Sequence, residues 1–393
     1  MDIEMEVEES PTTTTATTST TSASFKRLGM KNSIQTNFGD DYVFQIDSSQ
    51  ENSTLAVSLS TNAIKFYSPV TGQYFGECNG HSGPINQISF SDSSSPNVLQ
   101  SCSSDGTIRF WDIRTFNQVS LFKAGSSQEV FSFSLGGPTN SLLAAGCKSE
   151  VLIFFWDRRN GKQVACLEES HMEDVTQVHF APDHQNKLIS ASVDGLICIF
   201  DTEGNISDDD HLESVMNVGT SIGRVGFFGE MNQKLWCLTH IETLSIWDWK
   251  DGRNEANFQD ARSLASDSWT LDHVDYFVDC HYSAADDRLW VIGGTNAGTL
   301  GYFPVNYKGA NAIGSPEAVL EGGHSGIVRS VLPMSSIRGG PSQGRGIFGW
   351  TGGEDGRLCC WLSDEFSETK RSWISSALVM KSPKTRNKRH HPY

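Results

Sequence analysis

A histidine, a serine and an aspartate occur together in this chain at a spacing that invites a catalytic interpretation. His81 is followed by Ser101 and, four residues later, by Asp105. In serine hydrolases a histidine takes the proton of the nucleophilic serine, while an aspartate orients the imidazole ring. These three residue types therefore raise the question of a hydrolytic triad.

The trio is repeated, and its repetition argues against catalysis. It occurs again at His171, Ser190 and Asp194 and, with threonine in place of serine, at His324, Thr351 and Asp355. An enzyme needs one triad rather than three, and no Gly-x-Ser-x-Gly elbow accompanies them. In every copy an aromatic residue follows the aspartate by six positions: Trp111, Phe200 and Trp361. We therefore predict a repeated structural network and no catalytic residue.

Sequence patterns for other chemistry are missing as well. The chain has no G-x-x-x-x-G-K-[ST] phosphate loop and no H-E-x-x-H zinc motif. Its nine cysteines contain no C-x-x-C pair, which favours buried thiols over a zinc site. Residues 208–211, Asp-Asp-Asp-His, lack the glycine turn and the closing glutamate of a calcium loop. We expect a protein that is not an enzyme and has no metal, cofactor or small-molecule substrate.

A repeating unit must position these side chains. Short alternating strands recur along the chain, and each unit ends in an aromatic residue: Tyr67, Trp111, Trp156, Phe200, Trp247, Phe303 and Trp361. The steps between these residues are 44, 45, 44, 47, 56 and 58. A repeat of roughly 40–45 residues with this strand pattern is typical of a β-propeller. The sequence thus predicts an all-β, seven-bladed propeller with insertions around residues 251–273 and 304–322.

The best-preserved unit resembles a WD repeat. It opens with Gly80-His81 and closes with Trp111-Asp112, and an Asp-Gly pair between them suits a tight turn. The resemblance implies a hydrogen-bonded tetrad that ties the outer loop of a blade to its inner strands. Two units have all four residues: His81, Ser101, Asp105 and Trp111; His324, Thr351, Asp355 and Trp361. The unit of His171 has Phe200 in the last place, and units one, three, five and six are expected to rely on apolar packing.

The WD resemblance also implies a face that binds partner proteins. In such propellers this face is lined by residues three and five positions after each unit's histidine and by the residue before the turn aspartate. In this sequence they are Pro84, Asn86, Ser104, Asp174, Thr176, Val193, Ile327, Arg329 and Glu354, and unit three, which lacks the histidine, contributes Glu129 and Phe131 by the same alignment. We predict Phe131 and Ile327 as apolar anchors. The acidic Glu129, Asp174 and Glu354 would face a basic partner.

The two ends of the chain differ sharply in charge. The chain carries a net charge of −17, which disfavours nucleic-acid binding by the body and favours basic proteins. Residues 370–393 contain seven Lys and Arg and no acid, among them Lys381, Lys384, Arg386, Lys388 and Arg389. This segregation predicts a nuclear localisation signal or a weak RNA contact. No apolar run is long enough for a membrane span, and the acidic start is unlike a secretion signal, so we expect a soluble intracellular protein.

These features divide the chain into three parts. Residues 1–29 form an acidic, Thr-rich start that we expect to be disordered, 30–366 form the propeller, and 367–393 form the basic tail. A strand at about residues 30–39 is predicted to complete the blade of unit seven. The segment 370–380 competes for that position.

Two motifs point to an alternative function. Trp111-Asp-Ile-Arg114 and Trp156-Asp-Arg-Arg159 fit the W-D-x-R ending of units that resemble substrate receptors of cullin-RING ubiquitin ligases. In those receptors the arginine contacts the ligase adaptor. The competing interpretation is that Arg114 and Arg159 pair locally with the aspartate of the same motif.

The order of the less regular motifs resembles the WD repeat-containing protein 89 family. His171-Met-Glu-Asp-Val, Val291-Ile-Gly-Gly-Thr and Leu320-Glu-Gly-Gly-His occur in that order before the basic end, and the two ends resemble a plant member. The resemblance implies a scaffold in growth control linked to ribosome biogenesis. It also implies ribosomal or nucleolar protein partners. The basic tail suits entry into the nucleolus, so we expect residence in the nucleus, including the nucleolus, and in the cytoplasm.

Overall fold

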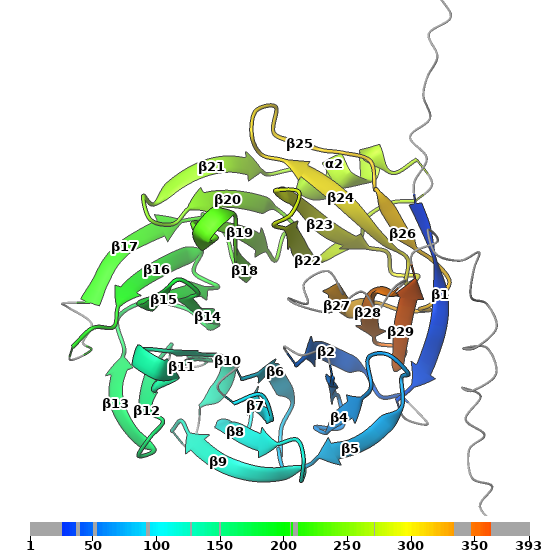
Figure 1. Cartoon of the computed structure of the whole chain (residues 1–393). Helices are drawn as coiled ribbons and strands as arrows, with labels where there is room; N and C mark the ends of the chain where they lie inside the picture. The colour runs from blue at the N-terminus through cyan, green and yellow to red at the C-terminus, as the bar shows by residue number, and fades with distance from the viewer. Residues whose placement is uncertain are drawn as a thin grey trace, which may run out of the picture.

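The strands are arranged as seven blades around a central axis (Figure 1). The computed structural model describes residues 26–36, 40–49, 53–91, 95–125, 128–148, 151–204, 206, 211–270, 272–333 and 347–362. In blades 1 to 5 neighbouring strands are consecutive in the sequence, as expected when tight turns join them. The predicted fold, a seven-bladed propeller, is confirmed.

Blades 1 to 4 follow the sequence repeat closely. Blade 1 consists of β2 (Val43–Ser48), β3 (Leu55–Leu59), β4 (Ile64–Tyr67) and β5 (Tyr74–Cys78). Blade 2 consists of β6 (Ile85–Phe90), β7 (Val98–Ser103), β8 (Thr107–Asp112) and β9 (Asn117–Lys123). Blade 3 consists of β10 (Glu129–Gly136), the 3-10 helix η1 (Pro138–Asn140), β11 (Leu142–Lys148), β12 (Ile153–Asp157) and β13 (Lys162–Leu167). Blade 4 consists of β14 (Val175–Ala181), β15 (His184–Ser192), β16 (Leu196–Asp201) and β17 (Leu212–Asn217).

The two insertions predicted from the long steps lie in blades 5 and 6. Blade 5 consists of β18 (Ile222–Phe228), η2 (Glu230–Asn232), β19 (Lys234–Thr239), β20 (Leu244–Asp248) and β21 (Arg253–Phe258), followed by helix α2 (Ala261–Ser268). Blade 6 consists of β22 (Tyr276–Ser283), β23 (Arg288–Gly294), β24 (Leu300–Asn306) and β26 (Ala318–Leu320), with the short β25 (Ala312–Ile313) paired to β24. The first insertion therefore supplies α2, and the second supplies β25.

The N-terminal strand closes the ring. Blade 7 consists of β27 (Val328–Pro333), β28 (Ile347–Gly353) and β29 (Arg357–Leu362), with β1 (Lys26–Gln35) as its outer strand. β1 pairs antiparallel with β29 and, through its first residues, parallel with β26 of blade 6. The strand predicted at about 30–39 therefore begins four residues earlier, at Lys26, and pairs where it was expected. The competing segment 370–380 lies outside the described residues. The first strand of the sequence thus completes the last blade of the ring.

The core lies between the blades. Seven clusters of buried apolar side chains are present among the described residues, and each joins two neighbouring blades. The repeat aromatics Tyr67, Trp111, Trp156, Phe200 and Trp361 are all buried in these clusters. Burial of such large side chains is the main favourable term in folding. Each blade therefore depends on its neighbours.

Polar contacts also link the innermost strands around the axis. Between blades 5 and 6 the contact is an ion pair from Arg224 to Asp279 at 2.9 Å. The other junctions use hydrogen bonds: Ile88 N to Gln45 Oε1 (2.7 Å), Phe133 N to Gln87 Oε1 (2.8 Å), Val178 N to Ser132 Oγ (3.1 Å), Thr176 Oγ1 to Ile222 O (2.9 Å), Val328 N to Tyr276 Oη (2.7 Å) and Ile46 N to Ser330 Oγ (3.0 Å). Side chains thus satisfy backbone groups that the innermost strand leaves unpaired.

Candidate functional site

One face of the propeller is built where the loop before each innermost strand meets the turn between the second and third strands. In blade 2, His81 from the loop lies 3.0 Å through Nδ1 from Asp105 Oδ2 in the turn. Its Nε2 lies 2.7 Å from Ser101 Oγ on β7. The indole N–H of Trp111 on β8 donates to the same hydroxyl at 2.8 Å. The four side chains form one continuous polar chain from the surface loop to the inner strands.

Blade 7 contains the same network with threonine in place of serine. His324 Nδ1 lies 3.0 Å from Asp355 Oδ1, and its Nε2 lies 2.8 Å from Thr351 Oγ1. The Trp361 indole N–H donates to Thr351 Oγ1 at 2.7 Å. The face that carries these loops and turns is called the tetrad face below.

Blade 4 contains a shortened version of the network. His171 Nδ1 lies 3.0 Å from Asp194 Oδ2, and Nε2 lies 2.7 Å from Ser190 Oγ. Phe200 occupies the position of the tryptophan and has no N–H to donate. Blade 4 therefore keeps the link between loop and turn but lacks the donor from the third strand.

The turn aspartates are charged and well satisfied. Burial raises the pKa of Asp194, but the hydrogen bonds from His171 and from the Met172 and Leu196 N–H groups outweigh it and hold the pKa at about 2. The pKa values of Asp105 and Asp355 are lowered for the same reason, against the effect of burial. A carboxylate that accepts several hydrogen bonds in this way favours its ionised form.

The hydroxyl groups of the three networks are not accessible. Ser101, Ser190 and Thr351 each have 0 % of their surface exposed. A nucleophile must reach its substrate, and these oxygens are enclosed by the blade and already hydrogen-bonded. The trios that invited a catalytic interpretation therefore act as structural links.

Blades without the His–Asp pair use other polar contacts at the same place. In blade 1 the Tyr42 N–H donates to Ser60 Oγ at 2.9 Å. In blade 5 Ser221 Oγ lies 2.6 Å from His240 Nδ1. In blade 6 the Asn296 N–H donates to Asp275 Oδ2 at 2.7 Å. These three units pack through the apolar clusters between blades, as predicted, and polar residues at different spacing also join loop and turn.

The residues predicted for partner binding differ in exposure. Pro84 and Arg329 are exposed, and eight others are half-buried: Asn86, Ser104, Glu129, Phe131, Asp174, Val193, Ile327 and Glu354. Thr176 is buried, and its hydroxyl donates to Ala191 O and Ile222 O. Thr176 therefore joins blades 4 and 5 and does not offer its side chain to a partner.

Several of these side chains already contact each other. The Asn86 amide donates to Ser104 Oγ at 3.1 Å and to Val130 O at 2.7 Å, so it bridges blades 2 and 3. Arg329 Nε donates to Glu354 Oε1 at 2.8 Å, and the two charges form an ion pair. The charge of Glu354, which was predicted to face a basic partner, is thus already paired with Arg329.

Cationic and apolar groups complete this face. The Lys148 ammonium lies 5.6 Å from the centre of the Phe131 ring, a cation–π contact that partly covers this predicted anchor. Met172, which directly follows His171, is 88 % exposed. Ile241, in the turn between β19 and β20, is 64 % exposed. Sequence reasoning missed both apolar residues, because they lie outside the positions three and five residues after the histidine.

The two W-D-x-R arginines lie at the opposite end of the third strand. Arg114 donates to Asp112 through Nε (2.9 Å) and Nη2 (2.6 Å), and Arg159 donates to Asp157 through Nε (2.9 Å) and Nη2 (3.0 Å). The hydrogen bonds from Arg114 lower the pKa of Asp112 to about 2. The arginine side chains are still 67 % and 76 % exposed. Each is held by its own aspartate, and a contact with an adaptor stays a prediction.

Three further predictions from the sequence concern the basic tail, metal binding and membrane spans. The basic residues Lys381, Lys384, Arg386, Lys388 and Arg389 lie outside them. Within the described part of the chain, no group of histidine, cysteine and acidic side chains has the geometry to hold a metal ion. No helix in that part is long and apolar enough to cross a membrane.

Several known proteins are similar to this chain in sequence. Residues 72–112 and 161–201 match the family described as WD domain, G-beta repeat. WD repeat-containing protein GTS1 of Arabidopsis thaliana is 63 % identical over 372 residues, which cover 94 % of this chain and 93 % of that protein. The WD repeat-containing protein 89 homolog of Dictyostelium discoideum is 35 % identical over 297 residues, which cover 75 % of this chain and 79 % of that protein.

This chain belongs to the WD repeat-containing protein 89 family. The family resemblance predicted from the sequence, including a plant relative, is confirmed by these two proteins. A chain in the crystal structure of a mitotic checkpoint complex superimposes with a TM-score of 0.63 at 14 % identity, covering 92 % of this chain and 98 % of that chain. At that identity the similarity supports the propeller fold of this WD-repeat protein and nothing further.

Proposed function

We propose that this WD-repeat protein is a non-enzymatic scaffold that holds basic protein partners on the tetrad face. The observation that carries the proposal is the support of that face by buried networks in blades 2, 4 and 7. Loops fixed in one conformation lose little freedom on binding, so affinity can come from the side chains they present. Near these loops lie the acidic Glu129 and Asp174 and the exposed Met172.

The charge of the chain supports a basic partner. Outside residues 370–393 the chain has 23 Lys and Arg against 47 Asp and Glu. Such an excess of acid steers positively charged proteins toward the propeller and raises their association rate. Ribosomal and nucleolar proteins fit this chemistry, and we propose that the scaffold acts in growth control linked to ribosome biogenesis. The basic tail is proposed to direct the protein to the nucleus and nucleolus, besides the cytoplasm, or to make a weak RNA contact.

Charge reversal on the tetrad face tests the proposal. Glu129→Lys combined with Asp174→Lys leaves the Arg329–Glu354 ion pair untouched, so the change is confined to the acidic surface. We expect association with a purified basic ribosomal protein to slow about tenfold and to become less sensitive to salt. The melting temperature should change little, because both side chains are only partly buried.

Two controls locate the binding surface. Asp251→Lys makes the same reversal in an exposed turn between β20 and β21, on the opposite face, and should leave the association rate nearly unchanged. Deletion of 370–393 should leave binding intact. If binding survives the double reversal and disappears with the tail, the tail is the binding site and the proposal fails.

A second candidate function is that of a substrate receptor of a cullin-RING ubiquitin ligase. The observation that favours it is the exposure of Arg114 and Arg159, each held in place by an aspartate, at equivalent positions of blades 2 and 3. For a receptor, Arg114→Ala or Arg159→Ala should abolish co-purification of the cullin adaptor without affecting folding. For the scaffold proposed above, neither change alters the set of co-purifying basic proteins, and this is the outcome we expect.

A further inference from the structure

The two insertions of blades 5 and 6 pack together on the rim of the propeller. Figure 1 shows α2 and β25 side by side outside blades 5 and 6. Ser268 Oγ at the end of α2 donates to Gly314 O after β25 at 3.0 Å. Ala261 and Ala265 of α2 share one apolar cluster with Ile313 of β25. Segments about 50 residues apart in the sequence thus form a single structural unit.

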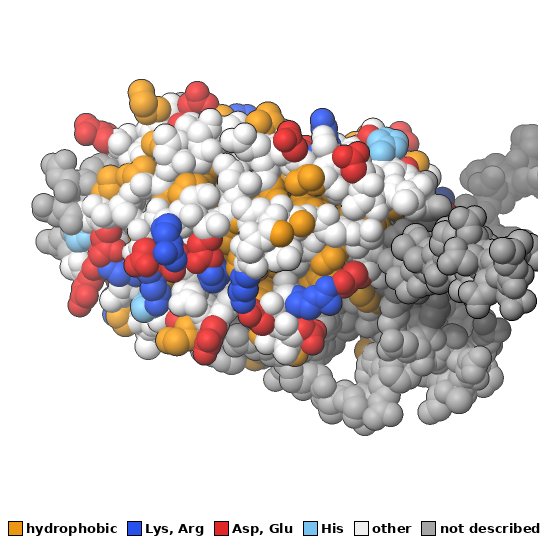
Figure 2. Space-filling view, turned by 90° about the horizontal axis from the view of Figure 1, so that it is seen from above, with side chains coloured by type: hydrophobic (Ala, Val, Ile, Leu, Met, Phe, Trp, Pro, Cys, Tyr) orange, Lys and Arg blue, Asp and Glu red, His pale blue; other side chains and the backbone are white. Residues whose placement is uncertain are grey.

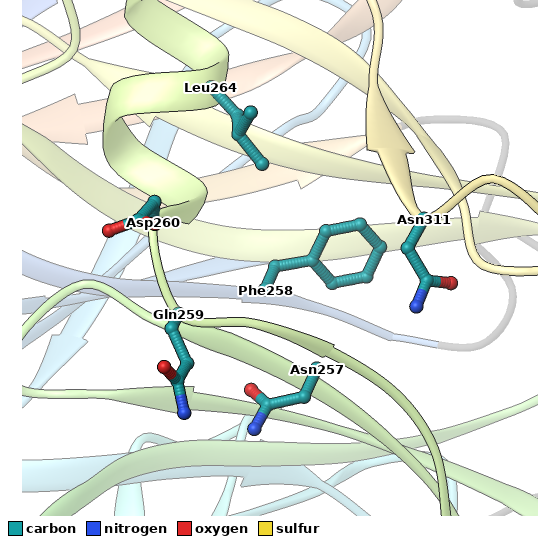
Figure 3. A pocket seen from close by; sticks show the side chains of 6 residues that line it. All are labelled: Asn257, Phe258, Gln259, Asp260, Leu264 and Asn311. Carbon is teal, nitrogen blue, oxygen red and sulfur yellow. The ribbon is translucent and has the colours of Figure 1, made fainter.

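This unit encloses one side of a pocket, which we call the rim pocket. Its volume is about 330 Å³, and it is lined by Asn257, Phe258, Gln259, Asp260, Leu264 and Asn311. Figure 3 shows Leu264 reaching from α2 and Asn311 from the β25 hairpin toward the ring of Phe258. Leu264 is 38 % exposed and supplies the apolar surface of the pocket, whereas Phe258 is buried beneath it. The polar residues around it are exposed.

The polar lining has no partners of its own. The side chains of Asn257, Gln259 and Asn311 make no hydrogen bond to any described residue. A carboxamide offers both a donor and an acceptor and so matches the peptide groups of an extended chain. β21, which leads into the pocket, is the outermost strand of blade 5 and is paired on one side only. A peptide in extended conformation fits such a strand edge.

The charges around the rim pocket are distributed unevenly. Figure 2, which looks onto this rim, shows a band where Lys and Arg lie among Asp and Glu, next to an area of uncharged and hydrophobic side chains. Several cations of blades 4 to 6 are already paired, among them Lys187 with Glu213 and Lys234 with Glu255. The Asp260 carboxylate, at the start of α2, forms no ion pair and no hydrogen bond within the described residues. An unpaired carboxylate at the edge of an otherwise uncharged pocket favours a cationic ligand.

We propose that the rim pocket binds an extended peptide segment of a protein partner. The segment places an apolar side chain against Leu264, its peptide groups against the carboxamides, and a lysine or arginine next to Asp260. This site is separate from the tetrad face and does not depend on the function proposed for that face. It gives the scaffold a second contact on the rim, so that two proteins can be held at once.

Selection of peptides tests the proposal directly. Random 12-residue peptides displayed on phage are selected on the full-length chain, and the enriched sequences are synthesised with a fluorescent label for anisotropy titration. We expect the enriched peptides to share an apolar residue close to a lysine or arginine. Leu264→Asp should weaken their binding about tenfold or more, since it places a charge in the apolar part of the pocket.

Two further variants keep the test decisive if Leu264→Asp reduces folding. Asn311 has a φ of +43°, so Asn311→Gly preserves the backbone while it removes the carboxamide, and binding should weaken several-fold. Asp260→Asn should weaken binding of the basic peptides and leave analogues without lysine or arginine unaffected. Val164→Asp, an exposed apolar position on β13 of blade 3, is the matched control and should have no effect.

Three outcomes would overturn the proposal. One is the absence of enriched peptides, and another is peptides that bind wild type and the three pocket variants equally well. The third concerns the chain's own residues 370–381, which also combine apolar and basic side chains. If a synthetic 370–381 peptide binds at this pocket and deletion of 370–393 increases the affinity for selected peptides, the occupant is the chain itself rather than a partner. Loss of binding in Asp174→Lys would place the peptides on the tetrad face and would also contradict the proposal.

Discussion

Blades 2 and 5 have the same strand order but hold their surface loops in different ways. In blade 2 a buried chain of four side chains runs from His81 to Trp111. In blade 5 an exposed side-chain contact, between Ser221 and His240, joins the same two segments. Both blades are nevertheless complete four-stranded sheets. The tetrad is therefore not required to form a blade; the apolar clusters between blades do that, and the tetrad fixes the loops.

The tryptophan of blade 5 shows how the network was replaced. Trp247 occupies the position of Trp111, but Cys237 stands where blade 2 has Ser101, so the hydroxyl acceptor is absent. The Trp247 indole N–H donates instead to Ser245 Oγ, two residues earlier on the same strand, at 2.8 Å. A buried indole N–H needs a partner, and blade 5 satisfies it locally. As a result the indole no longer connects the third strand to the surface loop.

The largest expected effect comes from removing the carboxylate of a complete tetrad. Asp105 accepts hydrogen bonds from His81, from the Ser82 N–H and from Thr107. Asp105→Ala leaves these groups without a partner, at about 1–3 kcal/mol for each buried one, so we expect a loss of about 3–5 kcal/mol in the free energy of unfolding. Asp355→Ala should have a similar effect. Urea titration followed by tryptophan fluorescence measures both.

Asp112→Ala is the matched control for this experiment. Asp112 lies on the same blade at the far end of β8 and pairs with the exposed Arg114. Solvent and salt screen an exposed ion pair, so its loss should have little effect on the free energy of unfolding. Equal destabilisation by Asp105→Ala and Asp112→Ala would contradict the importance assigned to the tetrad.

Acid should remove part of the stability of the tetrad blades. The pKa of Asp194 is about 2 in the folded chain, below the value of about 3.9 for an unfolded aspartate. Because the folded pKa is depressed, the contribution of Asp194 is fully present above about pH 5 and is lost as pH falls toward 2. Asp194→Asn should therefore cost about 2 kcal/mol at pH 6 and much less at pH 2.5. A difference between wild type and variant that is constant across this range would show that the charge of Asp194 plays no part.

Loss of the indole donor, which blade 2 has and blade 4 lacks, should have a smaller effect on the free energy of unfolding. Trp111→Phe converts the tetrad of blade 2 into the arrangement that blade 4 has with Phe200. The hydrogen bond from the indole to Ser101 should contribute about 1 kcal/mol. A double-mutant cycle of Trp111→Phe and Ser101→Ala isolates this term from the change in side-chain volume. A coupling energy of zero would mean that the indole contributes by packing alone.

Much of this comparison was visible in the sequence, and the rest depends on contacts without fixed spacing. The aromatic at the end of each unit and the Asp-Gly turn are local signals, so the number of blades and the tetrads followed from them. The contact from Ser221 to His240 exchanges the roles of loop and turn and therefore shares no motif with His81 and Asp105. The ion pair of Arg329 with Glu354 depends on side-chain conformation across 25 residues, which a single sequence does not reveal.

The rim pocket could not be predicted from the sequence either. The long steps between aromatics located both insertions correctly. Their packing against each other rests on contacts such as Ser268 with Gly314, 46 residues apart. Hydrophobic periodicity describes one element at a time and gives no information on which irregular segments meet. The pocket therefore required the structure.

The smallest effect on the free energy of unfolding is expected in blade 5. Ser221→Ala removes the exposed contact with His240, and both groups can then bond to water, so we expect a loss below about 0.5 kcal/mol in the free energy of unfolding. Its effect should appear instead in the mobility of the loop, since no other side chain of blade 5 joins loop and turn in the way that His81 does. Hydrogen exchange of the His240 N–H, which donates to Ser221 O at 3.0 Å, reports on that mobility. We expect exchange at this amide to accelerate in Ser221→Ala, whereas the corresponding Ser104 N–H of blade 2, bonded to Pro84 O at 3.0 Å, stays protected. If Ser221→Ala instead destabilises the chain as much as Asp105→Ala, the blade 5 contact is equivalent to a tetrad and the distinction between the two kinds of blade disappears.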